Sequence, residues 1–362
     1  MTKRGSIKKK EFSLDNFKKD MGYTEVPDKE LKWIPLSKAF QDAVGLPGIP
    51  KGYTALTRGY SDTGKSTTLY ECAVSCQKLG ILPIIIDSEN ALNREHLIKM
   101  GFDFDNDFYL IINNEFLWEK YGKKRDSKVK VHQASIEDLG AFMNDIMDNQ
   151  IKGDLDVEVC FLWDSIGTLD CLKTIRAEEK DTANNNMWNA GALESTFKSI
   201  LYQRIPASRK ETSKYTNTFL AVQKVWLDTQ SGGKGTIKHK GGEAFFYAAR
   251  LILHHGGILT HGTTDFTAKR KEKEIKFGVG TNIKVHKNQI TGVNFEGKII
   301  STPHGFISDS KDSIDEYKTA HLSYFRDVLG IEGDFTLEKV IDENSNVEMT
   351  INSDGGVDVK IE

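Results

Sequence analysis

The chain has 362 residues, of which 38% are apolar, so it is long enough to bury either one large core with appended ends or two domains. Its 49 basic and 52 acidic residues give a formal net charge of −3, which excludes a uniformly basic nucleic-acid binder and confines any such surface to a local patch. Because no apolar run reaches membrane length and no signal peptide is recognisable, we expect a cytoplasmic protein without a membrane partner.

Residues 1–30 are polar and rich in lysine, with Phe12 and Phe17 among the lysines. We expect an arm outside the core, which is either a solvated end or a short helix whose phenylalanines dock on a neighbouring subunit. A turn-rich passage over residues 43–52 then leads to an apolar strand at residues 53–56.

Residues 59–66 read GYSDTGKS, which is the GxxxxGKS pattern between a predicted strand and a predicted helix over residues 67–79. Phosphates carry more charge than one side chain can neutralise, so such a loop exposes several backbone N–H groups, and glycines permit that close approach. Lys65 can reach the outer phosphates, and the Ser66 hydroxyl can bind Mg²⁺. The predicted nucleotide-binding loop comprises Gly59, Tyr60, Ser61, Asp62, Thr63, Gly64, Lys65, Ser66 and Thr67.

Within that helix, Cys72 and Cys76 lie four residues apart with no second ligand pair after them, which favours buried thiols over a metal site.

Two further apolar segments end in carboxylates. Residues 81–87 form an unbroken apolar run, typical of a buried parallel strand, and Glu89 follows at the edge where ligands bind in open α/β sheets. A capping role for the acidic residues there is the alternative. Residues 157–165 end in Asp164, the Walker B pattern, whose carboxylate would orient Mg²⁺ together with Ser66.

Three polar segments are predicted to be loops. Residues 118–131 form a charged insertion, and residues 173–189 and 225–240 follow apolar strands and carry lysines and an aromatic residue each. Cations and aromatic rings in neighbouring loops are typical of a single-stranded nucleic-acid site, while ordinary solvated loops are the alternative. The candidate DNA contacts are Lys173, Arg176, Trp188, Trp226, Lys234, Lys238 and Lys240.

The C-terminal third continues with a helix that passes into a strand over residues 241–253, a strand over residues 275–288 and a helix over residues 314–328. His254, His255 and His261 lack accompanying carboxylates or cysteines, so we expect a hairpin rim and not a metal site. Residues 331–362 hold nine acidic residues against two lysines, a composition that can compete with nucleic acid for a basic surface.

Taken in order, several of these motifs resemble the RecA-type recombinase family and, more loosely, its phage UvsX-like relatives. The resemblance is carried by residues 46–52 (LPGIPKG), 87–92 (DSENAL), 163–165 (WDS), 241–251 (GGEAFFYAARL) and 281–288 (TNIKVHKN). It implies that Glu89 polarises the attacking water and that Gln223 senses the γ-phosphate and signals to the loop that begins at Val225. It also implies that His96 lies beside the adenine and that Lys287 reaches the nucleotide of a neighbouring protomer.

The chain departs from the family where Gln289 replaces a second lysine, which weakens the inter-subunit role or shifts it to Lys284.

We therefore predict an α/β fold: a RecA-like P-loop ATPase core with a mostly parallel twisted sheet flanked by helices, over residues 31–308 with two DNA-binding loops. An N-terminal arm over residues 1–30 and a short C-terminal extension with an acidic tail over residues 309–362 complete it.

The resemblance implies a DNA-dependent ATPase that uses ATP and Mg²⁺, forms a helical homo-oligomeric filament on single-stranded DNA, and exchanges strands with double-stranded DNA. It also implies a bacterial or phage-infected host cytoplasm, and it allows a single-strand-binding protein or a loader as further partners. A hexameric helicase motor and a nucleotide-gated DNA scaffold with negligible turnover remain as alternatives.

Overall fold

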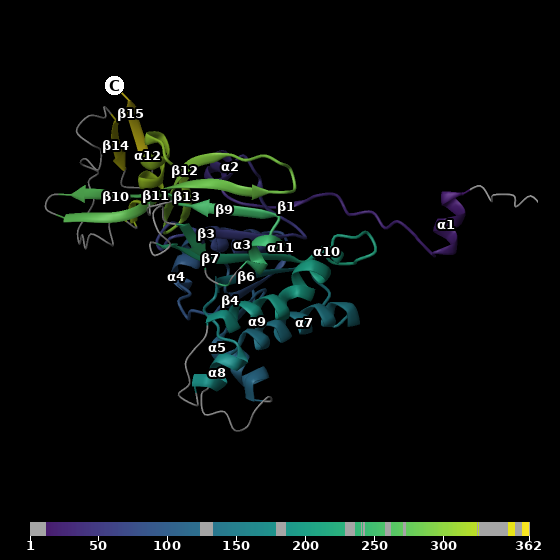
Figure 1. The fold of residues 1–362 in the computed structure, drawn as a ribbon. Helices are drawn as coiled ribbons and strands as arrows, with labels where there is room; N and C mark the ends of the chain where they lie inside the picture. The colour runs from purple at the N-terminus through teal and green to yellow at the C-terminus, as the bar shows by residue number, and fades with distance from the viewer. Residues whose placement is uncertain are drawn as a thin grey trace, which may run out of the picture.

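The computed structural model describes residues 12–123, 133–178, 186–228, 236–239, 241, 243–257, 262–270, 273–323, 325, 347–351 and 357–361. An eleven-stranded sheet forms its centre, and nine of the strands follow the order β13–β12–β11–β9–β3–β7–β6–β4–β5 (Figure 1). Their bounds, in that order, are Gly305–Ser308, Glu296–Thr302, Lys273–Asn288, Leu251–His255, Thr54–Gly59, Thr218–Asp228, Val159–Ile166, Leu82–Asp87 and Leu110–Asn113. Off this path, β10 (Thr263–Arg270) pairs with β11, and β8 (Thr236–His239) pairs with β7.

The six strands from β9 to β5 are parallel, while β11, β12 and β13 extend the sheet in antiparallel order. Every residue of β3 and β4 is buried, as expected for parallel strands that are covered on both faces. The predicted mostly parallel sheet flanked by helices is therefore confirmed.

Helices cover both faces of the sheet, with α7 and α9 on one side and α2 and α3 on the other (Figure 1). The first apolar cluster joins α2 (Lys38–Val44), α3 (Lys65–Lys78) and α4 (Arg94–Lys99) to one face. The second joins α5 (Asn114–Leu117), α7 (Ile136–Lys152), α9 (Asn186–Ser199) and α11 (Ala244–Ala248) to the other. The helix α7 begins with a capping box between Ser135 and Asp138 and ends at Gly153, whose φ of 87° suits a glycine.

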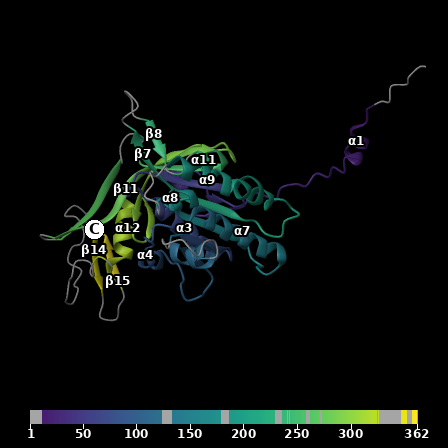
Figure 2. The ribbon, with the colours of Figure 1, turned by 60° about the horizontal axis from the view of Figure 1, so that its bottom comes forward.

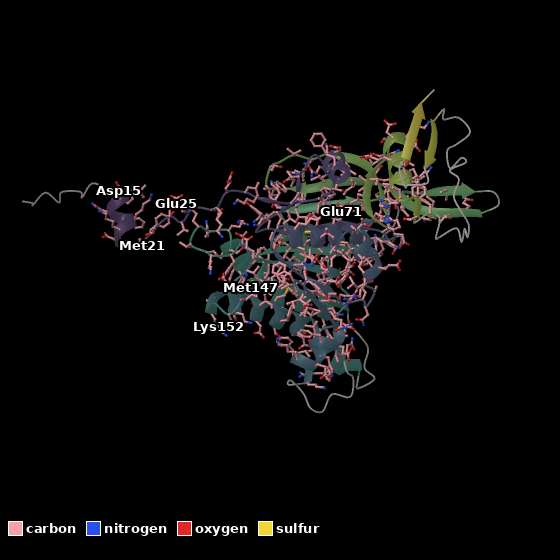
Figure 3. All side chains as sticks on the ribbon, turned by 180° about the vertical axis from the view of Figure 1, so that it is seen from behind. Asp15, Met21, Glu25, Glu71, Met147 and Lys152 are labelled. Atoms are coloured by element: carbon pink, nitrogen blue, oxygen red, sulfur yellow. The ribbon has the colours of Figure 1, made fainter. Side chains whose placement is uncertain are left out.

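A buried carboxylate ties the sheet extension to the α3 face. The Glu71 carboxylate accepts hydrogen bonds from the backbone N–H groups of Ser37 at 3.0 Å and Phe306 at 2.8 Å. Figure 3 labels Glu71 within the densely packed centre, far from Asp15 and Met21 on the arm. This contact fixes β13 next to the first turns of α3, where the predicted phosphate loop lies.

The N-terminal arm contains α1 (Leu14–Asp20), which has no buried residue and lies away from the core (Figures 1 and 3). Phe12 and Phe17 are 77% and 52% exposed, so their predicted docking on a neighbouring subunit is sterically open. The chain reaches the core by Val26, whose carbonyl accepts a hydrogen bond from Lys210 at 3.1 Å. A short two-stranded sheet of β1 (Trp33–Pro35) and β2 (Gly48–Pro50) then leads into β3.

Four loop or helix predictions need correction. The segment predicted as a loop at residues 173–189 is largely helical, with α8 (Leu172–Glu178) followed by α9, and residues 179–185 lie outside the described residues. The segment at residues 225–240 continues β7 to Asp228 and returns as β8, because the two strands pair in antiparallel register. The insertion at residues 118–131 begins with a π-helical turn, Trp118–Gly122, in which Trp118 packs into the core, and residues 124–131 lie outside the described residues. The helix predicted at residues 314–328 begins three residues earlier as α12, Lys311–Ala320, and residues 324 and 326–328 lie outside the described residues.

The cysteines are buried as predicted, and Cys160 of β6 joins Cys72 and Cys76 of α3, with their sulfur atoms within 4.8 Å of one another. A second π-helical turn (Ile200–Arg204), α10 (Ile205–Ala207) and the hairpin of β14 (Val347–Ile351) and β15 (Val357–Ile361) complete the elements. Within the described residues, no helix is both long enough and apolar enough to cross a membrane.

Candidate functional site

The phosphate-loop pattern lies where β3 ends and α3 begins, at the carboxyl edge of the sheet. Gly64 has a φ of 87°, in the left-handed region that glycine adopts without strain. A Cβ on Gly59 would lie 2.3 Å from the carbonyl oxygen of His255, so only glycine lets the loop pass that close to β9. Both predicted loop glycines are thus required by the backbone.

Lys65 and Thr63 are folded back onto the loop itself. The Lys65 ammonium donates to the carbonyl oxygen of Tyr60, and the Thr63 hydroxyl donates to the same carbonyl at 2.9 Å. Burial lowers the pKa of Lys65 to about 8, against the opposing effect of the Asp164 carboxylate. A buried cation that is hydrogen-bonded to a neutral carbonyl is well placed to bind an anion such as a phosphate.

The two predicted Mg²⁺ ligands are in contact, since the Ser66 hydroxyl donates to the Asp164 carboxylate at 2.7 Å. Burial raises the pKa of Asp164, and the nearby charge of Glu89 adds to the rise. A hydroxyl and a carboxylate are hard oxygen ligands of the kind that Mg²⁺ takes, so the donor set fits this ion, and a bound cation would relieve the unfavourable burial of the carboxylate.

The acidic residues after β4 have different roles. Asp87 caps the next turn, because its carboxylate accepts from the N–H groups of Ala91 and Leu92 at 3.0 Å each. Glu89 instead accepts from the Ser165 hydroxyl and forms an ion pair with Lys224 at 2.7 Å. The following helix is capped by Asn93, so the alternative that these acidic residues cap it is wrong, and Asp87 stabilises only the turn before it. Glu89 lies beside Asp164 and the phosphate loop.

Gln223 is fully buried on β7, where it pairs in register with Arg58, one residue before the loop. Its successor Lys224 is level with Gly59. The structure therefore brings Gln223, Glu89 and the loop to the same edge of the sheet.

His96 of α4 lines a cavity of about 410 Å³, whose other walls are β11 and β12. Its ring lies edge-on to Tyr70 at 5.5 Å, and burial lowers its pKa, so the ring is neutral near pH 7. The opposite wall is tied to the loop, because the hydroxyls of Thr67 and Ser301 lie 2.6 Å apart. The cavity thus adjoins the start of α3, next to the phosphate loop.

The histidines predicted to form a hairpin rim are instead buried in β9, and His261 lies outside the described residues. The Nδ1 atom of His255 lies 3.1 Å from the Thr63 carbonyl oxygen, and its Nε2 atom lies 3.3 Å from the Thr68 hydroxyl. These contacts hold the phosphate loop and the start of α3 against β9. Burial lowers the pKa of His255 to about 3, which keeps the ring neutral. The prediction failed because a histidine alone does not indicate whether it is buried. The apolar run Leu251–Leu253 directly before these histidines was the signal that could have predicted a buried strand.

The candidate DNA contacts are split between two surfaces. On the β7–β8 hairpin, Trp226 is 43% exposed and pairs directly across from Lys238, so both side chains share one face. Figure 2 shows this hairpin at the edge of the molecule, beyond α11. Lys234 and Lys240 lie outside the described residues.

On the other surface, the Lys173 ammonium lies 4.1 Å from the centre of the Trp188 ring, and Arg176 is exposed on α8. Trp188 also packs partly against the core, so its indole has less free surface than a loop position would give it.

Lys287 is held away from its own phosphate loop. Its ammonium donates to the carbonyl oxygens of Phe246 and Tyr247 on α11, at 2.9 and 3.3 Å. On the sheet, Lys287 of β11 pairs with Ile252 of β9, and Ile252 in turn pairs with Leu56 of β3. Lys287 thus lies level with a residue of β3 that comes three positions before Gly59.

The surroundings of Gln289 add a cation that the sequence did not reveal. Its side-chain oxygen accepts from the Arg250 guanidinium at 2.6 Å, so a positive charge still stands next to Lys287. Lys284 is engaged elsewhere, 3.5 Å from Glu296.

Sequence reasoning also missed Lys224, which forms the ion pair with Glu89. A signal was present, since Lys224 is the second polar residue after the buried run of β7 and the preceding residue, Gln223, was already singled out.

Comparison with models of protein families finds no match. Among curated proteins, the RecA protein of Frankia alni is 24% identical over 341 residues, which cover 90% of this chain and 87% of the relative. The RecA protein of Streptomyces avermitilis is 25% identical over 78% of this chain and 67% of its own length, and that of an Arthrobacter strain is 26% identical over 76% and 70%. The chain is thus similar, over most of its length, to RecA proteins.

Proposed function

We propose that the protein is a DNA-dependent ATPase that forms helical filaments on single-stranded DNA and exchanges strands with homologous double-stranded DNA. The observation that carries the proposal is the meeting of Ser66, Asp164 and Glu89 at the phosphate loop, next to the strand that continues into the hairpin with Trp226. The similarity to RecA proteins supports the DNA-linked role over other uses of a phosphate loop.

The reaction requires charge neutralisation and a positioned water more than covalent chemistry by the protein. Lys65 would leave the Tyr60 carbonyl for the outer phosphates, while the loop N–H groups bind the remaining phosphate oxygens. Ser66 and Asp164 would hold Mg²⁺, which supplies charge neutralisation on the phosphates when bound. Glu89 would accept a hydrogen bond from the attacking water and orient it toward the terminal phosphorus.

The nucleotide state would reach DNA through β7. Gln223 and the exposed Trp226 lie three residues apart on this strand, so a shift at the terminal phosphate is passed along a continuous backbone. Stacking of a base on an aromatic ring contributes about 1–3 kcal/mol, and cations such as Lys238 add contacts to phosphates.

We also propose that assembly completes the site, with Lys287 acting on the nucleotide of a neighbouring protomer. Its hydrogen bonds to α11 fix a cation at the surface, and Arg250 adds a second positive charge beside it. Two adjacent cations without an ion-pair partner among the described residues form a surface that attracts phosphate. The exposed α1, with Phe17 on it and Phe12 just before it, would provide a second subunit contact.

Electron microscopy with single-stranded DNA and a slowly hydrolysed ATP analogue tests the assembly, and a strand-exchange assay tests the activity. Helical filaments and joint-molecule formation are expected. Closed rings that unwind a duplex would instead identify a helicase, whereas filaments without ATP turnover or exchange would identify a scaffold.

A further inference from the structure

Lys224 is the residue of β7 that directly follows Gln223, and it lies level with Gly59 of the phosphate loop. Its ammonium is 2.7 Å from one oxygen of the Glu89 carboxylate. The side chains are 37% and 23% exposed, so the pair is only partly screened by water. This ion pair therefore lies at the carboxyl edge of the sheet, level with the phosphate loop.

The charges around this pair explain why a cation is needed there. Glu89 and Asp164 are like charges at close range, and the charge of Glu89 raises the pKa of Asp164. Lys65 is the nearby cation of the phosphate loop, and its ammonium already donates to the Tyr60 carbonyl. A second cation at Glu89 balances the second carboxylate and leaves Lys65 for the phosphates.

The contacts of Glu89 also fix its orientation. The Ser165 hydroxyl donates to one carboxylate oxygen, and Lys224 donates to the other. The carboxylate is therefore held from two sides.

We propose that Lys224 is a positioning residue for ATP hydrolysis, which holds the Glu89 carboxylate directed at the phosphate loop. This inference rests on the proposed ATPase role of Glu89 and deepens it. Because Lys224 lies two residues before the exposed Trp226 on the same strand, a movement of the β7–β8 hairpin reaches Glu89 through this ion pair. Occupancy of the hairpin by DNA and the orientation of the catalytic carboxylate are thereby coupled.

The test replaces Lys224 by Met, which keeps the length and removes the charge, and by Arg, which keeps the charge. In Lys224→Met we expect the kcat of ATP hydrolysis to fall at least about tenfold, with the Kd of a fluorescent ATP analogue changed less than about threefold. Lys224→Arg should restore most of the kcat. The matched control is Lys214→Met, which removes an exposed lysine paired with Asp156 at 2.7 Å and should leave turnover unchanged.

A double substitution shows whether Lys224 acts through Glu89. In single-turnover measurements, Lys224→Met should lower the rate no further when Glu89 is already Gln, because the carboxylate it orients is gone. Independent losses from the two substitutions would overturn the proposal. So would an unchanged or faster turnover in Lys224→Met, or a loss of analogue binding that matches the loss of rate.

A further measurement does not depend on activity. A zero-length carbodiimide joins amines and carboxylates that are in contact, so peptide mass spectrometry should find Lys224 joined to Glu89. Absence of this cross-link, when the Lys214 to Asp156 cross-link forms in the same sample, would refute the contact. If DNA fails to stimulate turnover, the proposed recombinase function fails, whereas the Lys224 comparison is still decided on the basal rate.

Discussion

The phosphate-loop edge and the β7–β8 hairpin are joined by one strand, yet different forces determine their structures. At the edge, Lys65 is 5% exposed and Ser66 is hydrogen-bonded to Asp164. On the hairpin, Trp226 is 43% exposed and its cross-strand partner Lys238 is exposed as well. The difference teaches that the groups at the edge are preorganised by burial, whereas Trp226 and Lys238 stay open to solvent.

This contrast has a functional consequence. Preorganised groups lower the free energy of the transition state, since they need little rearrangement during the reaction. Exposed cations and rings contribute binding free energy that depends on salt. Substitutions at the edge should therefore change turnover, and substitutions on the hairpin should change DNA affinity and its salt dependence.

The largest effect is expected for Lys65→Ala at the edge. Loss of the cation removes the charge that neutralises the outer phosphates, so ATP turnover should fall by about 10²-fold or more, even where some nucleotide still binds. Steady-state phosphate release measures the rate. Lys78→Ala, an exposed lysine in the last turn of the same helix, is the matched control and should keep the native rate. Near-native hydrolysis by Lys65→Ala would refute the phosphate-loop assignment.

A separation of binding from turnover is expected for Glu89→Gln. The substitution keeps the size and loses the negative charge, so turnover should fall about 10²-fold while a fluorescent ATP analogue still binds. Filaments should persist in ATP, because hydrolysis no longer dissolves them, and electron microscopy would follow their lifetime. Loss of analogue binding would make Glu89 a structural residue and would remove it from the preorganised group.

Nucleotide affinity should fall with rising pH above about 8. Burial lowers the pKa of Lys65 to about 8 in the free protein, so the ammonium loses its proton there and not near its usual 10.5. A bound phosphate favours the charged form, hence binding takes up a proton above pH 8, and the affinity should drop up to about tenfold per pH unit. Calorimetry in buffers of different ionisation enthalpy measures the uptake.

The control for this pH dependence is Lys65→Arg. A guanidinium stays protonated over the whole range, so its affinity, whatever its absolute value, should be flat between pH 8 and 10. If the nucleotide affinity of the native protein is equally constant between pH 8 and 10, Lys65 is not the titrating group, and its side chain is less buried than the structure indicates.

The sequence predicted the edge well because each of its parts is a local pattern. Gly59, Gly64 and Lys65 lie within one loop, and Asp164 ends an apolar run, so alternation of strands and helices was enough to bring them together. A local pattern does not show which side chains from different strands come into contact. The contacts of Lys224 with Glu89 and of Cys160 with the α3 cysteines follow from strand order, which periodicity leaves open.

The hairpin was harder to predict for a different reason. Glycines and lysines at residues 225–240 have the composition of a loop, but strand pairing depends on the partner and not on intrinsic preference. Residues 225–228 therefore extend β7 and pair with β8. Likewise, Trp188 was expected in a loop, but it lies on α9 and packs partly against the core.

The smallest effect is expected on the hairpin, where Lys234, Lys238 and Lys240 were predicted to contact DNA phosphates. Replacing all three by Ala should weaken single-strand binding and reduce the slope of log affinity against log salt by about 0.7 per lost phosphate contact, or about 2 in total. Fluorescence anisotropy over a salt series measures both quantities, and the basal ATP turnover should stay native. The control removes Lys78, Lys152 and Lys214, which are exposed away from the hairpin, so an equal loss of slope in both triple variants would indicate general electrostatic attraction.

An unchanged slope in the hairpin variant would exclude this surface from phosphate contacts. The DNA site would then have to lie on α8 and α9, where Lys173 covers Trp188, and the contrast between a preorganised edge and an open hairpin would no longer describe how the two functions are divided.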